Sequence, residues 1–420
     1  HINRAKLDER DAAFATQLVY GTLENQGVID RVLRQFAKMT RVNPWVKNIL
    51  RMGCYQILYL DRVPDSAACN ESVKLCQMFG FAPLKGFING VLRNISRKKD
   101  SLRILKETPT DLKSLSSLYG FPLWLVEMWA KEYGIEATRK IVKSSVGSSW
   151  TTIRINRRKT SRDEIIERLK KQGAEVKKGL YFDNALRMKG IGNIQSNPLY
   201  QQGLFTVQSE SSMLACHILN PKPGEYILDA CSAPGGKAIY LAELMNMEGK
   251  IYAFDNHDHR VGLINKNRER MNAAIVHSRV QDGTKFNPEF EENMDRVLLD
   301  VPCSGWGVIH KKPDIKLRIS KEDLSSLCQL QWDILENSSR YLKYGGMLVY
   351  STCTINPYEN NKLVERFIKE HPEFVLEGFD KELPDGLKSF VIQDGMIQLL
   401  PNKEGLDGFF IARLRRAKKR

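Results

Sequence analysis

The chain has 420 residues, 42% of them hydrophobic, which is enough for two or three domains with buried cores and excludes a disordered tail. Lysine and arginine number 64 against 49 aspartate and glutamate residues, so the net charge is +15 and the sequence pI is about 9.3. Such a positive field favours polyanionic partners, either nucleic acid or an anionic membrane surface. No apolar run approaches the roughly 20 residues that cross a bilayer, and acidic residues interrupt the first 30 residues, where a signal peptide would have its apolar core.

The eight cysteines form neither a dense disulfide framework nor a C-x-x-C pair. His257 and His259 lie two residues apart, but without a second pair of ligands they are expected to be solvated loop residues. We therefore expect a cytoplasmic protein with reduced thiols, no metal and no membrane partner.

Residues 1–130 are predicted to be helical throughout, because apolar residues recur at the spacings of three and four that place them on one helix face. Examples are the stripes Ile29–Phe36 and Leu84–Ile95. Asn43-Pro44 provides an N-cap and a first-turn proline, and Val63-Pro64-Asp65 interrupts the chain before another helix. A helical bundle without catalytic residues is either a binding module or a scaffold.

A Ser/Gly-rich patch at Ser144–Ser149 marks a boundary. After it, residues 151–156 alternate like a strand, 162–171 have a helical pattern and 180–188 return to extended segments, which predicts a small α+β subdomain. Its dense positive charge could neutralise several phosphates of a nucleic acid, and a merely solvated surface is the alternative. The basic residues are Arg154, Arg157, Arg158, Lys159, Arg162, Arg168, Lys170 and Lys171.

From Gly203 the pattern changes to alternating strands and helices. This predicts an α/β domain with a Rossmann-like, doubly wound and mostly parallel sheet that binds ligands at the carboxyl ends of its strands. The chain thus divides into residues 1–130, 131–202 and 203–420. The predicted strands are Tyr226–Asp229, Ile251–Asp255, Ile275–Val280, Val297–Asp300, Met347–Ser351 and Phe409–Leu414. The predicted helices are Lys237–Leu244, Val261–Met271, Leu324–Leu342 and Leu363–Glu370.

The first of these strands leads into Asp229–Lys237, where paired glycines between a strand and a helix let a ligand approach the backbone and the helix amides. The spacing is not G-x-G-x-x-G and no Walker pattern is present, so NAD and ATP are disfavoured. Asp255 ends the second strand, where an acid can bind ribose hydroxyls, and Asp282 follows the third, within reach of a base's exocyclic amine. A cofactor with adenosine but no phosphate to cradle, such as S-adenosylmethionine, fits these acids best.

Two thiols follow predicted strands at this same edge: Cys303 lies three residues after Asp300, and Cys353 follows Met347–Ser351. A lone cysteine is more often a small buried hydrophobe, and Asp300 with Cys303 alone suggests an acid beside a nucleophile. Two thiols and an acid fit methylation of a pyrimidine at C5. A thiolate adds to C6 while the acid assists at N3, which makes C5 nucleophilic toward a sulfonium methyl group. The C5 proton and the thiol must then leave.

Residues 203–414 resemble the RNA cytosine-C5 methyltransferases, and the whole chain resembles the RsmB (Sun/Fmu) branch of that family, which acts on small-subunit ribosomal RNA. Residues 1–130 resemble the NusB-like domain of that branch, and Arg154-Ile155-Asn156 resembles the opening strand of its small RNA-binding subdomain. The matching strings are Gly203–Gln208, Cys231–Lys237, Asp300–Gly307, Pro313–Lys316, Ser351–Cys353 with Pro357 and Glu359-Asn360, and Asp407–Phe410.

The resemblance implies S-adenosylmethionine as cofactor and a role for each matching residue. Cys353 would be the nucleophile, Cys303 would assist product release, and Asp300 would hold the cytosine at N3 and its amine beside the cofactor. Asp255 would bind the ribose and Asp282 the adenine. The cofactor loop would consist of Cys231, Ser232, Ala233, Pro234, Gly235, Gly236 and Lys237. The RNA contacts would come from Arg154, Asn156, Arg157, Arg158 and Lys159.

The implied substrate is 16S ribosomal RNA, before or during assembly of the small subunit, and we expect a monomeric enzyme. Three positions depart from the family pattern. Trp306 stands where Thr is usual, Ser209 where Asp is common and Lys311-Lys312 where Arg-His is frequent. These departures concern the shape of the RNA pocket more than the reaction.

Two other functions remain compatible with the sequence. One is a non-catalytic RNA-binding assembly factor, which would not bind S-adenosylmethionine. The other is a DNA cytosine methyltransferase, in which the Pro-Cys thiol would attack and the Thr-Cys motif would be unnecessary. Cofactor binding and a comparison of RNA with DNA as methyl acceptor separate these possibilities. The basic carboxyl end, residues 413–420, either adds phosphate affinity or is only a solvated end.

Overall fold

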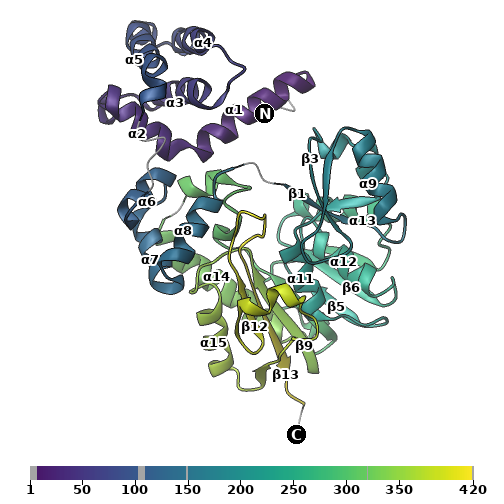
Figure 1. Ribbon diagram of the computed structural model, residues 1–420. Helices are drawn as coiled ribbons and strands as arrows, with labels where there is room; N and C mark the ends of the chain where they lie inside the picture. Colours follow the sequence, from purple (N-terminus) through teal and green to yellow (C-terminus); the bar gives the residue numbers. More distant parts are fainter. Residues whose placement is uncertain (1–6, 103–108, 148–149, 319, 419–420) are drawn as a thin grey trace. The chain divides into compact units, whose positions relative to one another are not determined.

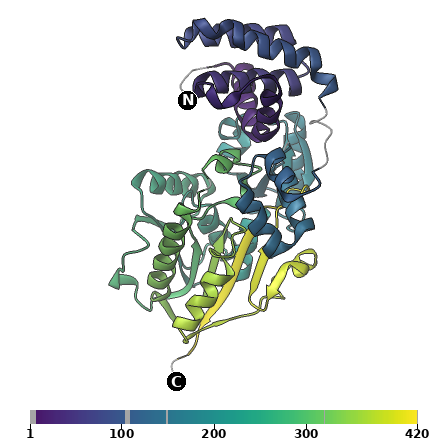
Figure 2. The ribbon, with the colours of Figure 1, turned by 90° about the vertical axis from the view of Figure 1, so that its left-hand side faces the viewer.

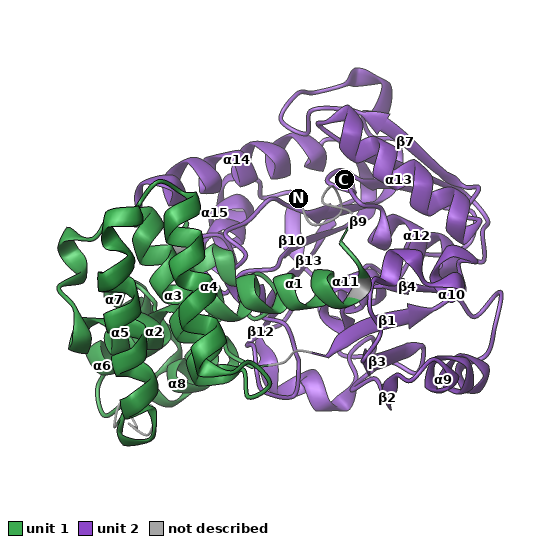
Figure 3. Ribbon diagram, turned by 90° about the horizontal axis from the view of Figure 1, so that it is seen from above, with its two compact units in different colours: residues 1–148, 309–318 green, residues 149–308, 319–420 purple. Residues whose placement is uncertain are grey.

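The computed structural model describes residues 7–102, 109–147, 150–318 and 320–418. They belong to two compact units, coloured separately in Figure 3. Unit 1 consists of residues 1–148 together with the short segment 309–318, and unit 2 consists of residues 149–308 and 319–420. Within the described ranges, no helix has both the length and the hydropathy that a membrane crossing needs.

Unit 1 is all-helical, as predicted for the amino-terminal part of the chain (Figure 1). The Asn43 side chain accepts a hydrogen bond of 2.9 Å from the Trp45 backbone N–H, and Pro44 occupies the first turn, so the predicted N-cap is confirmed. The helices continue through residue 130 as far as Ser144. They are α1 (Glu9–Glu24), α2 (Gln26–Phe36), α3 (Pro44–Tyr59), α4 (Asp65–Met78), α5 (Lys85–Lys98), α6 (Leu112–Tyr119), α7 (Leu123–Tyr133) and α8 (Ile135–Ser144).

Unit 2 begins with a four-stranded antiparallel sheet in the order β2-β3-β1-β4. Helix α9 (Arg162–Lys171) has the predicted bounds, and its Ile165 and Leu169 bury against Ile153 of the sheet. The predicted α+β subdomain is therefore present, and β4 comes from the stretch after residue 202. The strands are β1 (Thr151–Ile155), β2 (Glu175–Lys178), β3 (Ala185–Lys189) and β4 (Phe205–Val207).

The second sheet of unit 2 contains the predicted parallel strands and is mixed, because antiparallel strands continue it on one side. Five parallel strands stand in the order β7-β6-β5-β8-β9, and antiparallel strands extend the sheet beyond β9 as β13, β12 and β11, with β10 also paired to β13. The parallel strands are β5 (Tyr226–Asp229), β6 (Lys250–Asp255), β7 (Val276–Val280), β8 (Met294–Asp300) and β9 (Leu342–Thr352). The antiparallel ones are β10 (Phe374–Leu376), β11 (Val391–Gln393), β12 (Met396–Leu399) and β13 (Phe409–Arg416).

Helices cover both faces of this sheet, as the predicted doubly wound fold requires (Figure 1, Figure 2). Successive residues of a strand point to opposite faces. Ile227 and Val349 accordingly pack in one core with α11, α12 and α13, whereas Leu228 and Tyr350 pack in another with α14 and α15. The helices are α10 (Pro198–Gln201), α11 (Glu210–Leu219), α12 (Gly236–Leu244), α13 (Asp258–Met271), α14 (Glu322–Ser339) and α15 (Asn361–Glu370).

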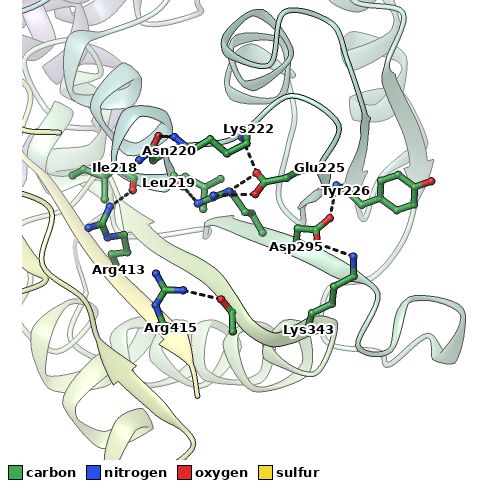
Figure 4. A network of polar contacts seen from close by, with 12 residues as sticks. Ile218, Leu219, Asn220, Lys222, Glu225, Tyr226, Asp295, Lys343, Arg413 and Arg415 are labelled. Carbon is green, nitrogen blue, oxygen red and sulfur yellow. Dashed lines mark hydrogen bonds and ion pairs between the residues drawn. The ribbon is translucent and has the colours of Figure 1, made fainter. Parts of the chain in front are cut away.

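The amino edge of the sheet, opposite the candidate site, is braced by ion pairs (Figure 4). Lys343 lies 2.6 Å from Asp295, which also accepts a hydrogen bond from the Tyr226 backbone N–H. The last strand contributes Arg413, which donates to the Ile218 carbonyl at 2.9 Å, and Arg415, which donates to the Gly345 carbonyl at 2.8 Å. The expected basic tail is thus corrected in part, because these two arginines belong to β13 and bond within the protein.

The segment 309–318 follows β8 in the chain but belongs to unit 1. Its 3-10 turn, η9 (Pro313–Leu317), carries Lys316, which is 7% exposed. The Lys316 ammonium donates to the carbonyls of Glu24 and Tyr119, the last residues of α1 and α6, at 3.4 and 3.3 Å, and lies 4.8 Å from the centre of the Phe121 ring. A cation at two helix carboxyl ends compensates their partial negative charges. Lys316 therefore attaches this segment to the helical unit.

Candidate active site

Parallel pairing of β8 and β9 brings the two predicted cysteines together. Asp300 pairs with Ser351 in the last register position, so the loops after both strands start at the same edge. Cys303 and Cys353 lie on these loops with their Sγ atoms 3.2 Å apart, and both thiols are free and half-buried. The predicted juxtaposition of the two cysteines is therefore present.

The thiol of Cys303 keeps its proton. Its hydrogen bond with Cys353, its burial and the nearby negative charges of Glu359 and Asp300 together hold the pKa of Cys303 well above its usual value. A protonated Cys303 can donate its hydrogen to the sulfur of Cys353.

Asp300 ends β8 and is held from two sides. Its Oδ2 atom lies 2.5 Å from the Lys237 ammonium, and its Oδ1 atom accepts a hydrogen bond of 3.1 Å from the Ser351 hydroxyl. Burial alone would lower the pKa of Lys237, but the charge and hydrogen bond of Asp300 raise it above the usual value. The acid at the cysteine edge is therefore already paired with a cation from the first turn of α12.

The loop Cys231–Lys237 joins β5 to α12. The Ser232 backbone N–H donates to the Phe254 carbonyl at 2.8 Å and so attaches the loop to β6. Gly235 has a φ of 94°, and a Cβ atom there would lie 3.2 Å from Ile264. Only glycine meets both conditions without strain. The loop thereby leaves the first amides of α12 available to a ligand.

Acids follow the neighbouring strands of the same edge. Asp255, 3% exposed at the end of β6, accepts a hydrogen bond of 3.2 Å from the Ala233 backbone N–H. Asp282, after β7, accepts from the backbone N–H and hydroxyl of Thr284 at 3.0 and 2.8 Å, and these bonds lower its pKa. Because β5, β6 and β7 are parallel neighbours, the loop and both acids lie along one edge. All the residues predicted to hold the cofactor therefore gather at that edge.

Buried polar atoms at this edge fit a polar ligand. Within the described ranges, Oδ1 of Asp255 accepts no hydrogen bond, although it lies 3.4 Å from the guanidinium of Arg260, and neither oxygen of Asp229 makes a hydrogen bond of normal geometry. Burial, partly offset by the charge of Lys237, raises the pKa of Asp229 to about 7. Buried polar atoms are nearly always satisfied, so a ribose hydroxyl suits Oδ1 of Asp255, which has an ion pair with Arg260 but accepts no hydrogen bond. No group of three or more His, Cys, Asp or Glu side chains is arranged to hold a metal ion in the described part of the chain.

The RNA contacts expected of Arg154 and Asn156 need correction. Arg154 is fully buried on β1, where it forms an ion pair with Glu243, donates to Gln208 at 2.6 Å and lies over the Tyr240 ring at 4.3 Å. Asn156, 1% exposed, donates to the Gly203 carbonyl at 3.1 Å. Both side chains bond inside unit 2 and cannot reach a phosphate from these positions.

The other three predicted RNA contacts are exposed. Arg157, Arg158 and Lys159 follow β1 on the surface of unit 2. The Lys159 ammonium donates to the carbonyls of Gln202 and Arg270 at 3.0 Å, which fixes its position. These three cations are available for phosphate contacts.

Two departures from the family pattern have a structural explanation. Ser209 accepts a hydrogen bond of 3.3 Å from the Ser212 backbone N–H and caps α11, a position that Asp fills equally well. Trp306 is 2% exposed, directly before Gly307, whose backbone N–H donates to the Cys353 carbonyl at 3.0 Å. The bulky indole is therefore buried next to a residue that bonds the Cys353 loop.

Sequence reasoning gave no role to Glu359, although it belongs to one of the matching strings. Its carboxylate accepts hydrogen bonds from Ser304, Gln331 and Asn356, and it is fully buried between the loops that carry the two cysteines. Glu359 lies six residues after Cys353 in a loop, and no helix or strand periodicity there indicates which groups its side chain contacts. Only the fold shows which groups surround it.

Comparisons with known proteins agree with this architecture. A family model described as 16S rRNA methyltransferase RsmB/F matches residues 216–415. The NusB family model matches residues 1–97, and a ferredoxin-like domain of RsmF/B-like methyltransferases matches residues 121–195. The predicted order of a NusB-like, a small α+β and a methyltransferase part is thereby confirmed.

Individual relatives match nearly the whole chain. The chain is 39% identical over 418 residues to a probable ribosomal RNA small subunit methyltransferase B of Bacillus subtilis, covering 99% of this chain and 93% of that protein. It is 32% identical over 413 residues to the ribosomal RNA small subunit methyltransferase B of Shewanella oneidensis, with coverages of 97% and 91%. The crystal structure of PH0851 superposes with a TM-score of 0.82 at 30% identity, covering 99% of this chain and 92% of that one. The chain therefore belongs to the RsmB/F family of 16S rRNA methyltransferases.

Proposed function

We propose that this protein transfers a methyl group from S-adenosylmethionine to C5 of a cytosine in 16S ribosomal RNA, through a covalent bond between Cys353 and C6 of the base. The observation that carries the proposal is the 3.2 Å separation of the Cys303 and Cys353 sulfurs at the strand edge that ends in Asp300. The names of the relatives from Bacillus subtilis and Shewanella oneidensis support ribosomal RNA of the small subunit as the substrate.

The cofactor-binding residues are proposed from their place at the same edge. Oδ1 of Asp255, which accepts no hydrogen bond within the protein, suits a ribose hydroxyl, and Asp282 suits the exocyclic amine of adenine. S-adenosylmethionine, when bound, supplies an electrophilic methyl group. The loop from Cys231 to Lys237 would hold its remaining part against the first amides of α12, with Asp300 beside it.

The first half of the reaction makes C5 of the cytosine nucleophilic. The Cys353 thiolate adds to C6, while Asp300, steadied by Lys237 and Ser351, binds N3 and the amine of the base. The electron density that the sulfur brings accumulates at C5, which then accepts the methyl group.

The second half releases the product. A base removes the C5 proton, the C6–sulfur bond breaks, and its electron pair returns to Cys353. The Cys303 sulfur lies 3.2 Å from that of Cys353, and its thiol can donate a hydrogen bond that stabilises the departing thiolate. This division of work assigns attack to Cys353 and release to Cys303, although Cys303 is the thiol nearer in sequence to Asp300.

The remaining parts of the chain are proposed to bind the substrate. Residues 1–130, the NusB-like part, would contact RNA or an assembly protein, residues 131–202 would contact RNA through Arg157, Arg158 and Lys159, and residues 203–420 would carry the reaction. Phosphate contacts of this kind add affinity without sequence specificity. The protein would act on the RNA before or during assembly of the small subunit.

The test is to incubate the protein with labelled S-adenosylmethionine and either 16S RNA or DNA of the same sequence, and to identify the methylated nucleoside. We expect 5-methylcytidine in RNA, at one position when mapped by bisulfite sequencing, and no label in DNA. Label in another nucleoside, or in DNA, would contradict the proposal. A protein that binds RNA but no S-adenosylmethionine would instead be the non-catalytic assembly factor.

A further inference from the structure

The side chain of Glu359 is a buried carboxylate shared by the two cysteine loops. It is fully buried, at 0% relative exposure. Oε2 accepts hydrogen bonds from the Ser304 backbone N–H at 2.9 Å and from the Gln331 side-chain amide at 2.8 Å. Oε1 accepts from the Ser304 hydroxyl and, at 2.8 Å, from the Asn356 side-chain amide. Each carboxylate oxygen therefore accepts two bonds, all from neutral donors.

These bonds fix both neighbours of Cys303. Ser304, directly after it, bonds Glu359 through backbone and side chain. Pro302, directly before it, accepts a hydrogen bond of 2.8 Å at its carbonyl from the same Gln331 amide that bonds Glu359. Gln331 is itself fully buried on α14. The backbone of Cys303 is thus held on both sides through one carboxylate.

The neighbours of Cys353 join the same network. The Thr354 hydroxyl bonds the Ser304 hydroxyl at 2.7 Å, and the Thr352 hydroxyl donates to the Asn360 side chain at 2.7 Å. Glu359 is also fixed through its own backbone, because the Tyr350 hydroxyl donates to its carbonyl at 2.7 Å. The two loops are therefore joined by hydrogen bonds between residues next to the two cysteines.

Such a network requires a charged acceptor. Hydrogen bonds to a carboxylate are roughly twice as strong as those between neutral groups. Burying a charged carboxylate is costly unless hydrogen bonds satisfy both of its oxygens. The two loops are therefore held in the one conformation that provides all four donors. An amide in place of the carboxylate would direct two N–H groups at donors whichever way it turned.

We propose that Glu359 is a positioning residue for methyl transfer, which sets the place of Cys303 relative to Cys353 by fastening the loop after β8 to the loop after β9. The inference rests on the covalent reaction proposed above. Glu359 bonds Ser304 directly and reaches Pro302 through Gln331, whereas it reaches Thr354 beside Cys353 only through the Ser304 hydroxyl. Its loss therefore affects product release more than attack. The signature is an enzyme that forms the covalent RNA adduct and resolves it slowly.

The test compares Glu359→Gln with a matched control, Glu210→Gln. Glu210 is also buried and accepts hydrogen bonds of 2.7 to 2.9 Å from the backbone N–H groups of Leu180, Tyr181 and Phe182, none of which belongs to a cysteine loop. Covalent enzyme–RNA adduct is measured by denaturing electrophoresis, and turnover by methyl incorporation, at equal amounts of folded protein. For E359Q we expect turnover roughly 10- to 100-fold lower, with a larger fraction of the enzyme in the adduct. For E210Q we expect the ratio of adduct to turnover to stay at the wild-type value.

A milder variant, Ser304→Ala, removes one donor to Glu359 and keeps the carboxylate. We expect the same shift toward adduct, smaller in size, and S304A decides the matter if E359Q does not fold. An adduct-to-turnover ratio at the wild-type value in S304A and in any folded E359Q would overturn the proposal. Methyl transfer by Cys353→Ala would instead overturn the proposed function itself, whatever the Glu359 variant does.

Discussion

The ammonium of Lys237 lies 2.5 Å from Oδ2 of Asp300, so the acid proposed to hold the cytosine is already paired with a cation from the cofactor loop. One ion pair thereby connects the two halves of the proposed site, the base and the methyl donor. The pair lies where β5 and β8 run side by side, with Asp229 of β5 level with Leu298 of β8.

Replacing Lys237 with Met should slow methyl transfer roughly 10- to 100-fold, because Asp300 loses the partner that orients it. Single-turnover transfer from labelled cofactor, at saturating RNA, measures this rate. Lys343→Met is the control, because Lys343 forms a similar pair with Asp295, at 2.6 Å, on the opposite edge of the sheet. Equal rates for the two variants would contradict the role of the Lys237–Asp300 pair.

Asp229 should make stability depend on pH. Burial raises its pKa to about 7, whereas an unfolded aspartate titrates near 4, roughly. Between these values the folded protein holds a proton that the unfolded chain has released, so the free energy of unfolding decreases as pH rises through this window. Denaturant unfolding from pH 4 to 8 should show this contribution in the wild type, relative to Asp229→Asn. Parallel pH profiles for the two proteins would contradict it.

Gly307 should not tolerate a side chain. A Cβ atom there would lie within 1.9 Å of the Gly408 carbonyl oxygen, and the Gly307 N–H bonds the Cys353 carbonyl. Gly307→Ala should therefore lower the free energy of unfolding by about 1–3 kcal/mol and displace the Cys353 loop, so that adduct formation also falls. Gly262→Ala on α13, with nothing within 4 Å of its Cβ, is the control and should be neutral or stabilising. Equal stability of G307A and wild type would contradict the close approach.

Lys316→Met should destabilise unit 1, because the carbonyls of Glu24 and Tyr119 lose their shared donor. The expected loss is about 1–3 kcal/mol, measured by denaturant unfolding followed at a probe in unit 1. Lys113→Met, on the exposed surface of α6, is the control and should stay within about 0.5 kcal/mol of wild type. An unchanged K316M would mean that the segment 309–318 is held in unit 1 by other contacts.

Much of the fold could be predicted where one periodic pattern acts alone. Helix α9, which Ser161 caps at its start, and strand β5 both have the bounds that the sequence pattern predicts. The predicted helix ending at Leu342 is wrong at its end, because α14 ends at Ser339 and Leu342 already begins β9. The short antiparallel strands β11 and β12 were not predicted.

Parts of the site could be predicted because topology places them. Cys303 and Cys353 follow adjacent parallel strands, so their meeting follows from the order of the sheet. Arg154 could not be assigned correctly, because its partner Glu243 lies 89 residues further along the chain and a charged residue on a strand is usually solvated. The contacts of Lys316 could not be predicted for the same reason, because its partners Glu24 and Tyr119 lie far away in the sequence.

The most direct test of the proposed reaction is the covalent adduct in the two cysteine variants. Each is incubated with 16S RNA and S-adenosylmethionine, and protein–RNA species are resolved under denaturing conditions. We predict that Cys303→Ala accumulates a denaturation-resistant adduct with little turnover, because attack proceeds and release fails, whereas Cys353→Ala forms no adduct and no 5-methylcytidine. Adduct formation by C353A, or normal turnover without trapping by C303A, would contradict the assignment of attack to Cys353 and release to Cys303.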